Sequence, residues 1–277
     1  MKIVETVAGM RQVRKQLAGP VGFVPTMGYL HEGHLSLIRL ARAESSSLVV
    51  SLFVNPAQFG PDEDFKTYPR DIKRDFSLME KEKTDVVFMP PTEEIYPPDF
   101  NSWVNVSRIS EKLEGASRPG HFRGVATVCA KLFNIIQPYT VYIGQKDAQQ
   151  ALVLRKMVAD LNMNLKLITL PTIREFDGLA VSSRNAYLNP KERQAAVILY
   201  RALCLARGLR SQEEKDAKKI RRQMVNLIKQ EPLAAIDYVS IADAETLEEL
   251  DMVPLGALVS MAVRIGRTRL IDNVVLE

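Results

Sequence analysis

The sequence predicts an α/β protein in which a doubly wound parallel sheet is followed by a smaller C-terminal α+β domain with a short antiparallel sheet. From residue 21 to about 171, short β-branched or aromatic runs alternate with longer stretches of helical period. Most of the short runs are almost continuously apolar, as strands are when helices cover both faces of a parallel sheet. The pattern changes after about residue 174, so we expect domains at 1–174 and 175–277.

Five strands are expected in the first domain, and helices separate most of them. The expected strands are 21–26, 48–55, 85–90, 140–144 and 165–171. The expected helices are 34–45, 71–83, 121–137 and 148–162. Segment 58–70 follows the second strand, is polar, contains Pro and Gly, and has no clear period. Such a segment is typical of a mobile lid beside a binding site.

The second domain begins with a strong helix-start signal. Asn189 is a candidate N-cap, Pro190 takes the first helical position and Glu192 the third. This start predicts a helix that runs on through "YRALCLARGL", and a charged helix is expected at roughly 212–230. The runs "IDYVSIAD", "ALVSMAVRIG" and "TRLIDNVVL" predict three strands joined by turns.

The composition is that of an ordinary globular protein, with 46% hydrophobic and 25% charged residues. The 37 basic residues are nearly balanced by 33 acidic ones, so the net charge of +4 does not by itself predict a nucleic-acid partner. Cys129 and Cys204 lie far apart in apolar patterns, which argues against a disulfide framework and predicts a cytoplasmic protein. No apolar run approaches the ~20 residues of a membrane span, so no membrane partner is expected.

Polar and basic side chains follow several of the expected strands. Because ligands bind beyond the carboxyl ends of the strands in an open parallel sheet, these side chains are expected to share one site. Backbone N–H groups, helix N-termini and positioned cations at such an edge suit a polyanion. The residues concerned are His31, His34, Asn55, Gln58, Lys146, Asp147, Gln150, Arg174, Ser182, Ser183 and Arg184.

The stretch "PTMGYLHEGHLSLIRLA" holds two of the three histidines. Their spacing fits capping or surface histidines as well as it fits phosphate ligands, whether as neutral donors or as cations. Gly33, between His31 and His34, lets the backbone approach a ligand closely. A zinc site is disfavoured because His121 comes without a nearby Cys or Asp ligand pattern.

Two further clusters point to an anion. Lys146 follows a strand, and the spacing of Asp147 and Gln150 is that of a capping box. Asp147 could therefore cap the helix and also meet a ribose hydroxyl. The Gln150 side chain could hydrogen-bond either to the backbone at the helix start or to a ligand. Arg118 and His121 flank the start of the 121–137 helix, where cations oppose the helix dipole unless an anion binds.

Known nucleotide-binding loops are absent, since neither G-x-x-x-x-G-K-[ST] nor G-x-G-x-x-G occurs. However, "HEGH" after the first strand and the later "SSR" resemble the HIGH and KMSKS signatures of the nucleotidyltransferase superfamily. More specifically, five motifs in order from residue 21 to about 190 resemble those of the pantothenate synthetase (pantoate–β-alanine ligase) family. They are "FVPTMGYLHEGHLSLIRLA", "VSLFVNPAQFGPDEDFKTYPR", "SRPGHFRGVATVCAKLFNIIQP", "GQKDAQQ" and "REFDGLAVSSRNAYL", and the later "IDYVSIAD" and "RLIDN" also fit.

This resemblance implies a Rossmann-like fold and an ATP-dependent ligation of pantoate and β-alanine to pantothenate. The reaction would pass through a pantoyl adenylate and release pyrophosphate and AMP, with Mg²⁺ on the triphosphate. It also implies a homodimer formed through the N-terminal domain, to which segment 101–109 could contribute. The C-terminal domain would cover the nucleotide.

Residue roles follow by motif position. The resemblance implies the catalytic residues His31, His34, Lys146 and Arg184. It implies an ATP site of Pro25, Thr26, Met27, Gly33, His34, Gly144, Lys146, Asp147, Val181, Ser182, Ser183 and Arg184. Pantoate would be bound by Met27, Gln58 and Gln150, with support from Asn55, Arg118 and His121, and Asp75 is a possible metal ligand. Val181 stands where the family usually has methionine.

Two other functions fit the residues less well. A nucleotidyltransferase of the same superfamily without a ligation step would need a group for an acceptor phosphate, whereas Gln58 and Gln150 suit a neutral diol acid. An RNA-binding module is disfavoured because no basic stripe with interleaved exposed aromatics is evident.

Overall fold

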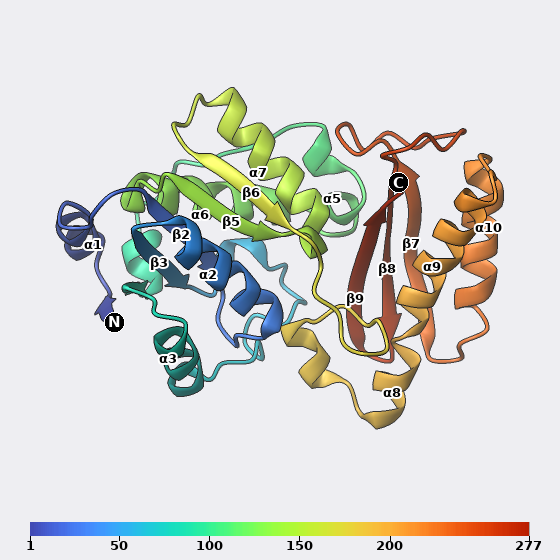
Figure 1. Cartoon of the computed structure of the whole chain (residues 1–277), viewed down its shortest axis with the longest axis horizontal. Helices are drawn as coiled ribbons and strands as arrows, with labels where there is room; N and C mark the ends of the chain where they lie inside the picture. Colours follow the sequence, from blue (N-terminus) through green and yellow to red (C-terminus); the bar gives the residue numbers. More distant parts are fainter. Residues whose placement is uncertain (277) are drawn as a thin grey trace.

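The structure, a computed structural model, describes residues 1–276 and contains two sheets that lie side by side along the long axis (Figure 1). The N-terminal sheet has six strands and the C-terminal sheet has three. Within the described residues, no helix combines the length and the apolar character that a membrane crossing needs.

All neighbouring strands of the six-stranded sheet are parallel, in the order β1-β4-β3-β2-β5-β6. The strands are β1 (Lys2–Val4), β2 (Val21–Thr26), β3 (Ser47–Leu52), β4 (Val86–Phe88), β5 (Thr140–Gly144) and β6 (Lys166–Leu170). From β2 the chain moves outward through β3 and β4, then returns to the other side of β2 to form β5. The doubly wound parallel sheet is confirmed, and its order reverses between β2 and β5.

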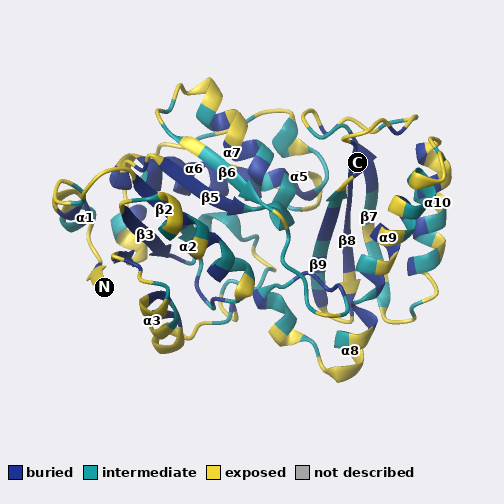
Figure 2. Cartoon of the chain, in the orientation of Figure 1, coloured by how far each residue is buried: buried dark blue, intermediate teal, exposed yellow. Residues whose placement is uncertain are grey.

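Helices cover both faces of this sheet, which explains the continuous apolar runs. Phe23 and Val49 face one core, whereas their neighbours Val24 and Val50 face the other. The first core includes side chains of α1 (Val7–Arg14), α6 (His121–Ile136) and α7 (Ala148–Asp160). The second includes side chains of α2 (Glu32–Glu44) and α3 (Ile72–Lys81). Figure 2 shows the central strands buried between these layers.

The C-terminal part packs three helices on an antiparallel sheet of order β7-β8-β9. Its elements are α8 (Pro190–Ala195), α9 (Ile198–Ser211), α10 (Ala217–Ile228), β7 (Ala234–Ala242), β8 (Leu258–Ile265) and β9 (Thr268–Val275). Helices α9 and α10 lie on the side of this sheet away from the six-stranded sheet (Figure 1). The opposite side therefore faces the N-terminal part.

Short helices occupy several connections. They are α4 (Thr92–Ile95), α5 (Glu114–Ser117), η1 (Pro56–Gln58), η2 (Ile109–Glu111), η3 (Gln145–Asp147) and η4 (Ser183–Tyr187). Strand β1 and helix α1 were not expected from the sequence, because three strand residues and a short helix carry little periodic signal.

Some expected boundaries were wrong for local reasons. The second strand ends at Leu52, because the Asn55 side chain accepts the Ala57 N–H and starts η1. The helix that follows Asn189 is divided after Ala195, where Ala196 and its neighbour have the shallow ψ values of a 3₁₀ turn. The predicted capping box of Asn189 is confirmed.

The charged helix expected from about residue 212 begins only at Ala217, because the Asp216 side chain accepts the Lys219 N–H as its cap. The expected domain boundary at residue 174 stays a prediction. It falls between Leu170, the last residue of β6, and Leu179, the first residue of the C-terminal core.

Helix α6 packs so closely on η1 that a side chain has no room at Gly124. A Cβ there would lie 2.1 Å from the Ala57 carbonyl oxygen, whereas a Cβ at Gly208 in α9 would meet nothing within 4 Å. We expect Gly124→Ala to lower the free energy of unfolding by about 1–3 kcal/mol through overpacking. Gly208→Ala is the matched control and should raise it by about 0.5–1 kcal/mol through helix propensity.

Urea denaturation of both variants measures the difference. A Gly124→Ala chain as stable as the original would contradict this close approach of α6 to η1.

Candidate active site

A cavity of about 1520 Å³ lies at the switch point between β2 and β5 and extends to the C-terminal sheet. Residues from the loops after β2, β3, β5 and β6 line it, together with the turn between β8 and β9. Every predicted site residue except Asp75 and Arg174 lies on its wall, and Arg174 instead donates two hydrogen bonds to Asp272. The topology therefore brings together residues that are as much as 159 positions apart, from Pro25 to Arg184.

His31 and His34 stack on each other at the start of α2. His31 is the N-cap and His34 the third helical residue, with ring centroids 4.0 Å apart. The His31 backbone N–H donates to His34 Nδ1 at 3.4 Å, which leaves the His34 proton on Nε2. The Nδ1 atom of His31 is buried and has no partner within residues 1–276. Both residues line the cavity, and the Nε2–H of His34 is the imidazole donor that the helix start leaves unused.

Both histidines are neutral in this environment. Burial, reinforced by the positive charge of Lys146, lowers the pKa of His31 to about 4. Burial also lowers the pKa of His34 well below its ordinary value, with further contributions from His31 and Lys146. The sequence left open whether these side chains act as cations or neutral donors, and burial favours the neutral form in the chain without a bound anion.

Asp75 does not lie on the cavity wall. Its carboxylate accepts the backbone N–H groups of Tyr29 and Leu30, at 2.8 and 2.7 Å, and its side chain is buried. Tyr29 follows Gly28, and both have positive φ, so these bonds stabilise a strained turn between β2 and α2. Both carboxylate oxygens of Asp75 thus hold this turn, and its possible metal role stays a prediction. Within residues 1–276, His, Cys, Asp and Glu side chains form no group of three that could hold a metal ion.

Lys146 lies in η3, between β5 and α7, and its ammonium is 3.9 Å from the Asp147 carboxylate. The expected capping box is not formed: Asp147 is the N-cap of α7, but its side chain makes no capping hydrogen bond. The reason is that η3 runs directly into α7, which gives Asp147 a ψ of 58° instead of an extended backbone. Asp147 and Gln150 thus both line the cavity with their polar ends available to a ligand.

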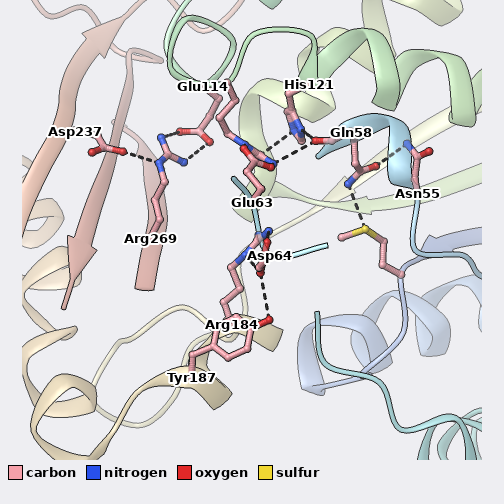
Figure 3. Close-up of polar contacts among 12 residues, drawn as sticks. Asn55, Gln58, Glu63, Asp64, Glu114, His121, Arg184, Tyr187, Asp237 and Arg269 are labelled. Atoms are coloured by element: carbon pink, nitrogen blue, oxygen red, sulfur yellow. Dashed lines mark hydrogen bonds and ion pairs between the residues drawn. The ribbon is translucent and has the colours of Figure 1, made fainter. Parts of the chain in front are cut away.

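The side-chain amide of Gln58 is held in one orientation by its neighbours (Figure 3). Asn55 Nδ2 donates to Gln58 Oε1 at 3.0 Å, and Gln58 Nε2 lies 3.2 Å from Met27 Sδ. The Asn55 oxygen in turn accepts the hydroxyl of Tyr96 at 2.9 Å. The Gln58 amide nitrogen therefore points toward the end of β2, where it can donate to oxygen atoms of a ligand.

His121 and Arg118 hold the backbone of the same residue. His121 Nδ1 donates to the Gln58 carbonyl oxygen at 2.8 Å, and Arg118 Nη1 donates to His121 Nε2 at 3.2 Å. Burial and the adjacent guanidinium lower the pKa of His121 to about 4, so the ring stays neutral. The anion expected at the start of α6 is here a carboxylate, because Glu63 accepts two hydrogen bonds of 2.6 Å from Arg118.

A second pair of an arginine and a carboxylate holds segment 58–70, which was expected to act as a lid. Asp64, next to Glu63, accepts hydrogen bonds from Arg184 at 2.8 and 3.0 Å and from the Tyr187 hydroxyl at 3.2 Å (Figure 3). Two consecutive carboxylates of segment 58–70 thus neutralise two cavity arginines that lie in different parts of the chain. The mobility of this segment stays a prediction.

The C-terminal sheet contributes charged residues that sequence analysis missed. Arg264, Arg267 and Arg269 line the cavity from the β8–β9 hairpin. Arg269 also bridges the two parts of the protein, with hydrogen bonds of 2.7 and 2.8 Å to Glu114. The sequence feature that could have revealed them is the presence of three arginines within six residues at a predicted hairpin turn. An exposed hairpin would show the same pattern, so this feature alone does not indicate a binding site.

Comparison with known proteins decides which family carries this site. A family model described as Pantoate-beta-alanine ligase matches residues 2–275. The chain belongs to the pantoate-beta-alanine ligase family. Membership makes it an enzyme of the ligase class and confirms the family resemblance of the sequence motifs.

Individual members of the pantoate-beta-alanine ligase family match over almost the whole chain. The pantothenate synthetase of Roseiflexus castenholzii is 57% identical over 277 residues, and the match covers 100% of both chains. A crystal structure of pantothenate synthetase from Thermus thermophilus is 46% identical, with a TM-score of 0.95 and 99% of each chain covered. That of pantoate-beta-alanine ligase from Francisella tularensis, complexed with "Beta-gamma ATP" and β-alanine, is 33% identical, with a TM-score of 0.82 and coverage of 99% of this chain and 97% of that one.

The neutral, buried state of His121 makes stability depend on pH. The unfolded chain binds a proton on this histidine below a pH of about 6.5, but the folded chain does so only near pH 4. The free energy of unfolding should therefore fall as the pH decreases through this window. In His121→Gln the fall should be smaller, because one of the buried histidines that resist protonation is removed.

Urea unfolding of both chains at about pH 7 and about pH 5 measures the two differences in unfolding free energy. Equal differences in the two chains would show that His121 is not the group that resists protonation.

Proposed function

We propose that this ligase joins pantoate and β-alanine to pantothenate in an ATP-dependent reaction that passes through a pantoyl adenylate. Pyrophosphate leaves in the first step and AMP in the second. The observation that carries the proposal is the convergence of two kinds of group on one cavity at the switch point. One kind is the histidine pair with Lys146, and the other is the oriented amide of Gln58 together with Gln150. Family membership and the nucleotide complex of the Francisella tularensis relative support it.

In the first step, a pantoate carboxylate oxygen attacks the α-phosphorus of ATP and the bond to pyrophosphate breaks. Negative charge grows on the phosphate oxygens, and Lys146 and the Nε2–H of His34 would stabilise it. Neutral histidines suit this role because they donate hydrogen bonds without needing a proton from solution. Arg184 and the hydroxyls of Ser182 and Ser183 would close on the phosphates from the far wall.

In the second step, the β-alanine amine attacks the carbonyl carbon of the pantoyl adenylate and AMP leaves. No covalent bond to the protein is formed in either step. The amide groups of Gln58 and Gln150 and the backbone N–H of Met27 would hold the hydroxyls and carboxylate of pantoate. Amide groups suit these partners because they both donate and accept without bringing a charge.

The nucleoside would lie along the end of β5. Gly144 and Asp147 are proposed to face the ribose, and Val181 the adenine. The backbone N–H of Val181 donates to the Ile173 carbonyl oxygen at 3.0 Å, so this wall is held by backbone bonds that valine and methionine make equally.

Mg²⁺ would neutralise the triphosphate, held by phosphate oxygens and water. Within the described residues, no group of three His, Cys, Asp or Glu side chains could hold the ion, and Asp147 is the carboxylate beside the proposed phosphate site, so phosphate oxygens would supply most of its ligands.

A homodimer in the cytoplasm is part of the same proposal. In segment 101–109, Trp103 is 44% exposed, stacks on Tyr96 and lies under the Arg123 guanidinium. A large aromatic surface beside a cation is typical of a protein interface, so this segment suits a second copy of the chain.

Product analysis tests the proposed reaction. Incubation with Mg-ATP and pantoate should release pyrophosphate only when pantoate is present, and continued AMP formation should also require β-alanine. Transfer of AMP to a phosphorylated acceptor, with no ligation, would instead favour the simpler nucleotidyltransferase.

His34→Ala tests the proposed transition-state donor. We expect pantoate-dependent pyrophosphate release to fall by about 10² or more, as when a positioned donor to a developing charge is lost. Glu32→Ala, in the first turn of the same helix but exposed and paired with Arg39, should keep the original rate. An unchanged rate in His34→Ala would mean that this histidine only supports the helix start.

A further inference from the structure

Asn273, in strand β9 of the C-terminal sheet, binds the turn that carries Lys146. Its Nδ2 donates to the carbonyl oxygens of Gln145 and Lys146, at 3.0 and 2.9 Å. The Gln145 side chain donates back to Asn273 Oδ1 at 3.2 Å. Asn273 is only 4% exposed, so water cannot replace these bonds without opening the contact.

A buried ion pair holds Asn273 itself. Asp272, 2% exposed, accepts two hydrogen bonds from Arg174, at 2.7 and 2.9 Å. Its Oδ1 also accepts the backbone N–H of Asn273 at 2.8 Å. Arg174 comes from the segment that follows β6, so a strand end, the connecting segment and the Lys146 turn form one hydrogen-bonded unit.

The carbonyls that Asn273 binds belong to the short turn that carries Lys146. They lie in η3, a three-residue turn between a strand and a helix, so a change at either carbonyl rotates the backbone that aims the Lys146 side chain. The ammonium group that the site directs at phosphate thus depends on a donor from the other part of the chain.

We propose that Asn273 is a positioning residue that aims Lys146 at the nucleotide phosphates and makes the lysine effective only while the C-terminal sheet is docked. The inference rests on the proposed function in one respect, the assignment of Lys146 to phosphate. A contact that merely joined the two parts of the protein would not act through this lysine, and the experiment separates the two roles.

A double-mutant cycle between Asn273→Ala and Lys146→Ala tests the coupling. The measured quantity is the Kd of a nonhydrolysable ATP analogue with Mg²⁺, by calorimetry, because binding remains measurable in chains that do not turn over. Loss of the two donors should weaken binding by about tenfold in the original chain. In the Lys146→Ala chain the same change should weaken binding by less than about twofold, because the group it aims is already absent.

Lys112→Met is the matched control. Lys112 also joins the two parts, through Glu248 and the Thr246 carbonyl oxygen, but it touches neither η3 nor the cavity wall. This variant should bind the analogue as the original chain does. If Lys112→Met weakens binding as much as Asn273→Ala, or if Asn273→Ala has an equal effect with and without Lys146, the proposal is overturned in favour of simple docking.

Thermal melting identifies a variant that does not fold. In that case Asn273→Ser, which keeps one hydroxyl donor, takes the place of Asn273→Ala and should show a smaller loss that again disappears without Lys146. Pantoate-dependent pyrophosphate release by the unmodified chain is measured separately. Its absence would reject the proposed reaction, whereas the binding cycle alone decides the role of Asn273.

Discussion

The site depends above all on the pairing of β2 with β5 at the centre of the parallel sheet. In this pairing Gly22 lies opposite Thr140 and Phe23 opposite Val141, although the two strands are separated by β3, β4 and their helices in the sequence. Because both strands run in the same direction, the turns that follow them open at the same edge. The stacked histidines and Lys146 meet for this reason, and the two layers of helices keep the pairing buried.

At that edge of the sheet, burial and ion pairs set the charges of the side chains that line the cavity. The histidines stay neutral because burial and a nearby lysine oppose their protonation. The charges of Arg118 and Arg184 are compensated by the carboxylates of Glu63 and Asp64. An anionic ligand at this edge would therefore meet the histidines and Lys146 on one wall and, on another, arginines paired with carboxylates from a single loop.

The C-terminal part is joined to this edge by polar contacts rather than by a shared hydrophobic core. Its own core lies on the far side of the three-stranded sheet, against α9 and α10. The contacts across the boundary are directional, such as the pair of Arg269 with Glu114 and the bonds from Asn273 to η3. Directional contacts specify how the parts dock, while leaving less apolar surface to separate if they move.

The sequence alone was enough to predict the parallel sheet and about a third of the residues that line the cavity. Continuous apolar strands reveal a sheet covered on both faces, and residues in the loops that follow such strands are expected at its ligand-binding edge. His31, Lys146 and Gln58 were predictable in this way, and their roles were then implied by the family motifs. Short elements such as β1 were missed, because local periodicity needs more residues than they contain.

Tertiary structure decided the features that depend on partners distant in the sequence. Asp75 resembled a possible metal ligand, yet two backbone amides from the β2–α2 turn use its carboxylate. Asp147 had the spacing of a cap, but the preceding 3₁₀ turn gave it the wrong backbone angles. The neutral state of His121 arises from burial, and the contact of Asn273 with η3 arises from approach across the boundary between the two sheets. Neither leaves a periodic trace in the sequence, because both are set by which surfaces meet after the chain has folded.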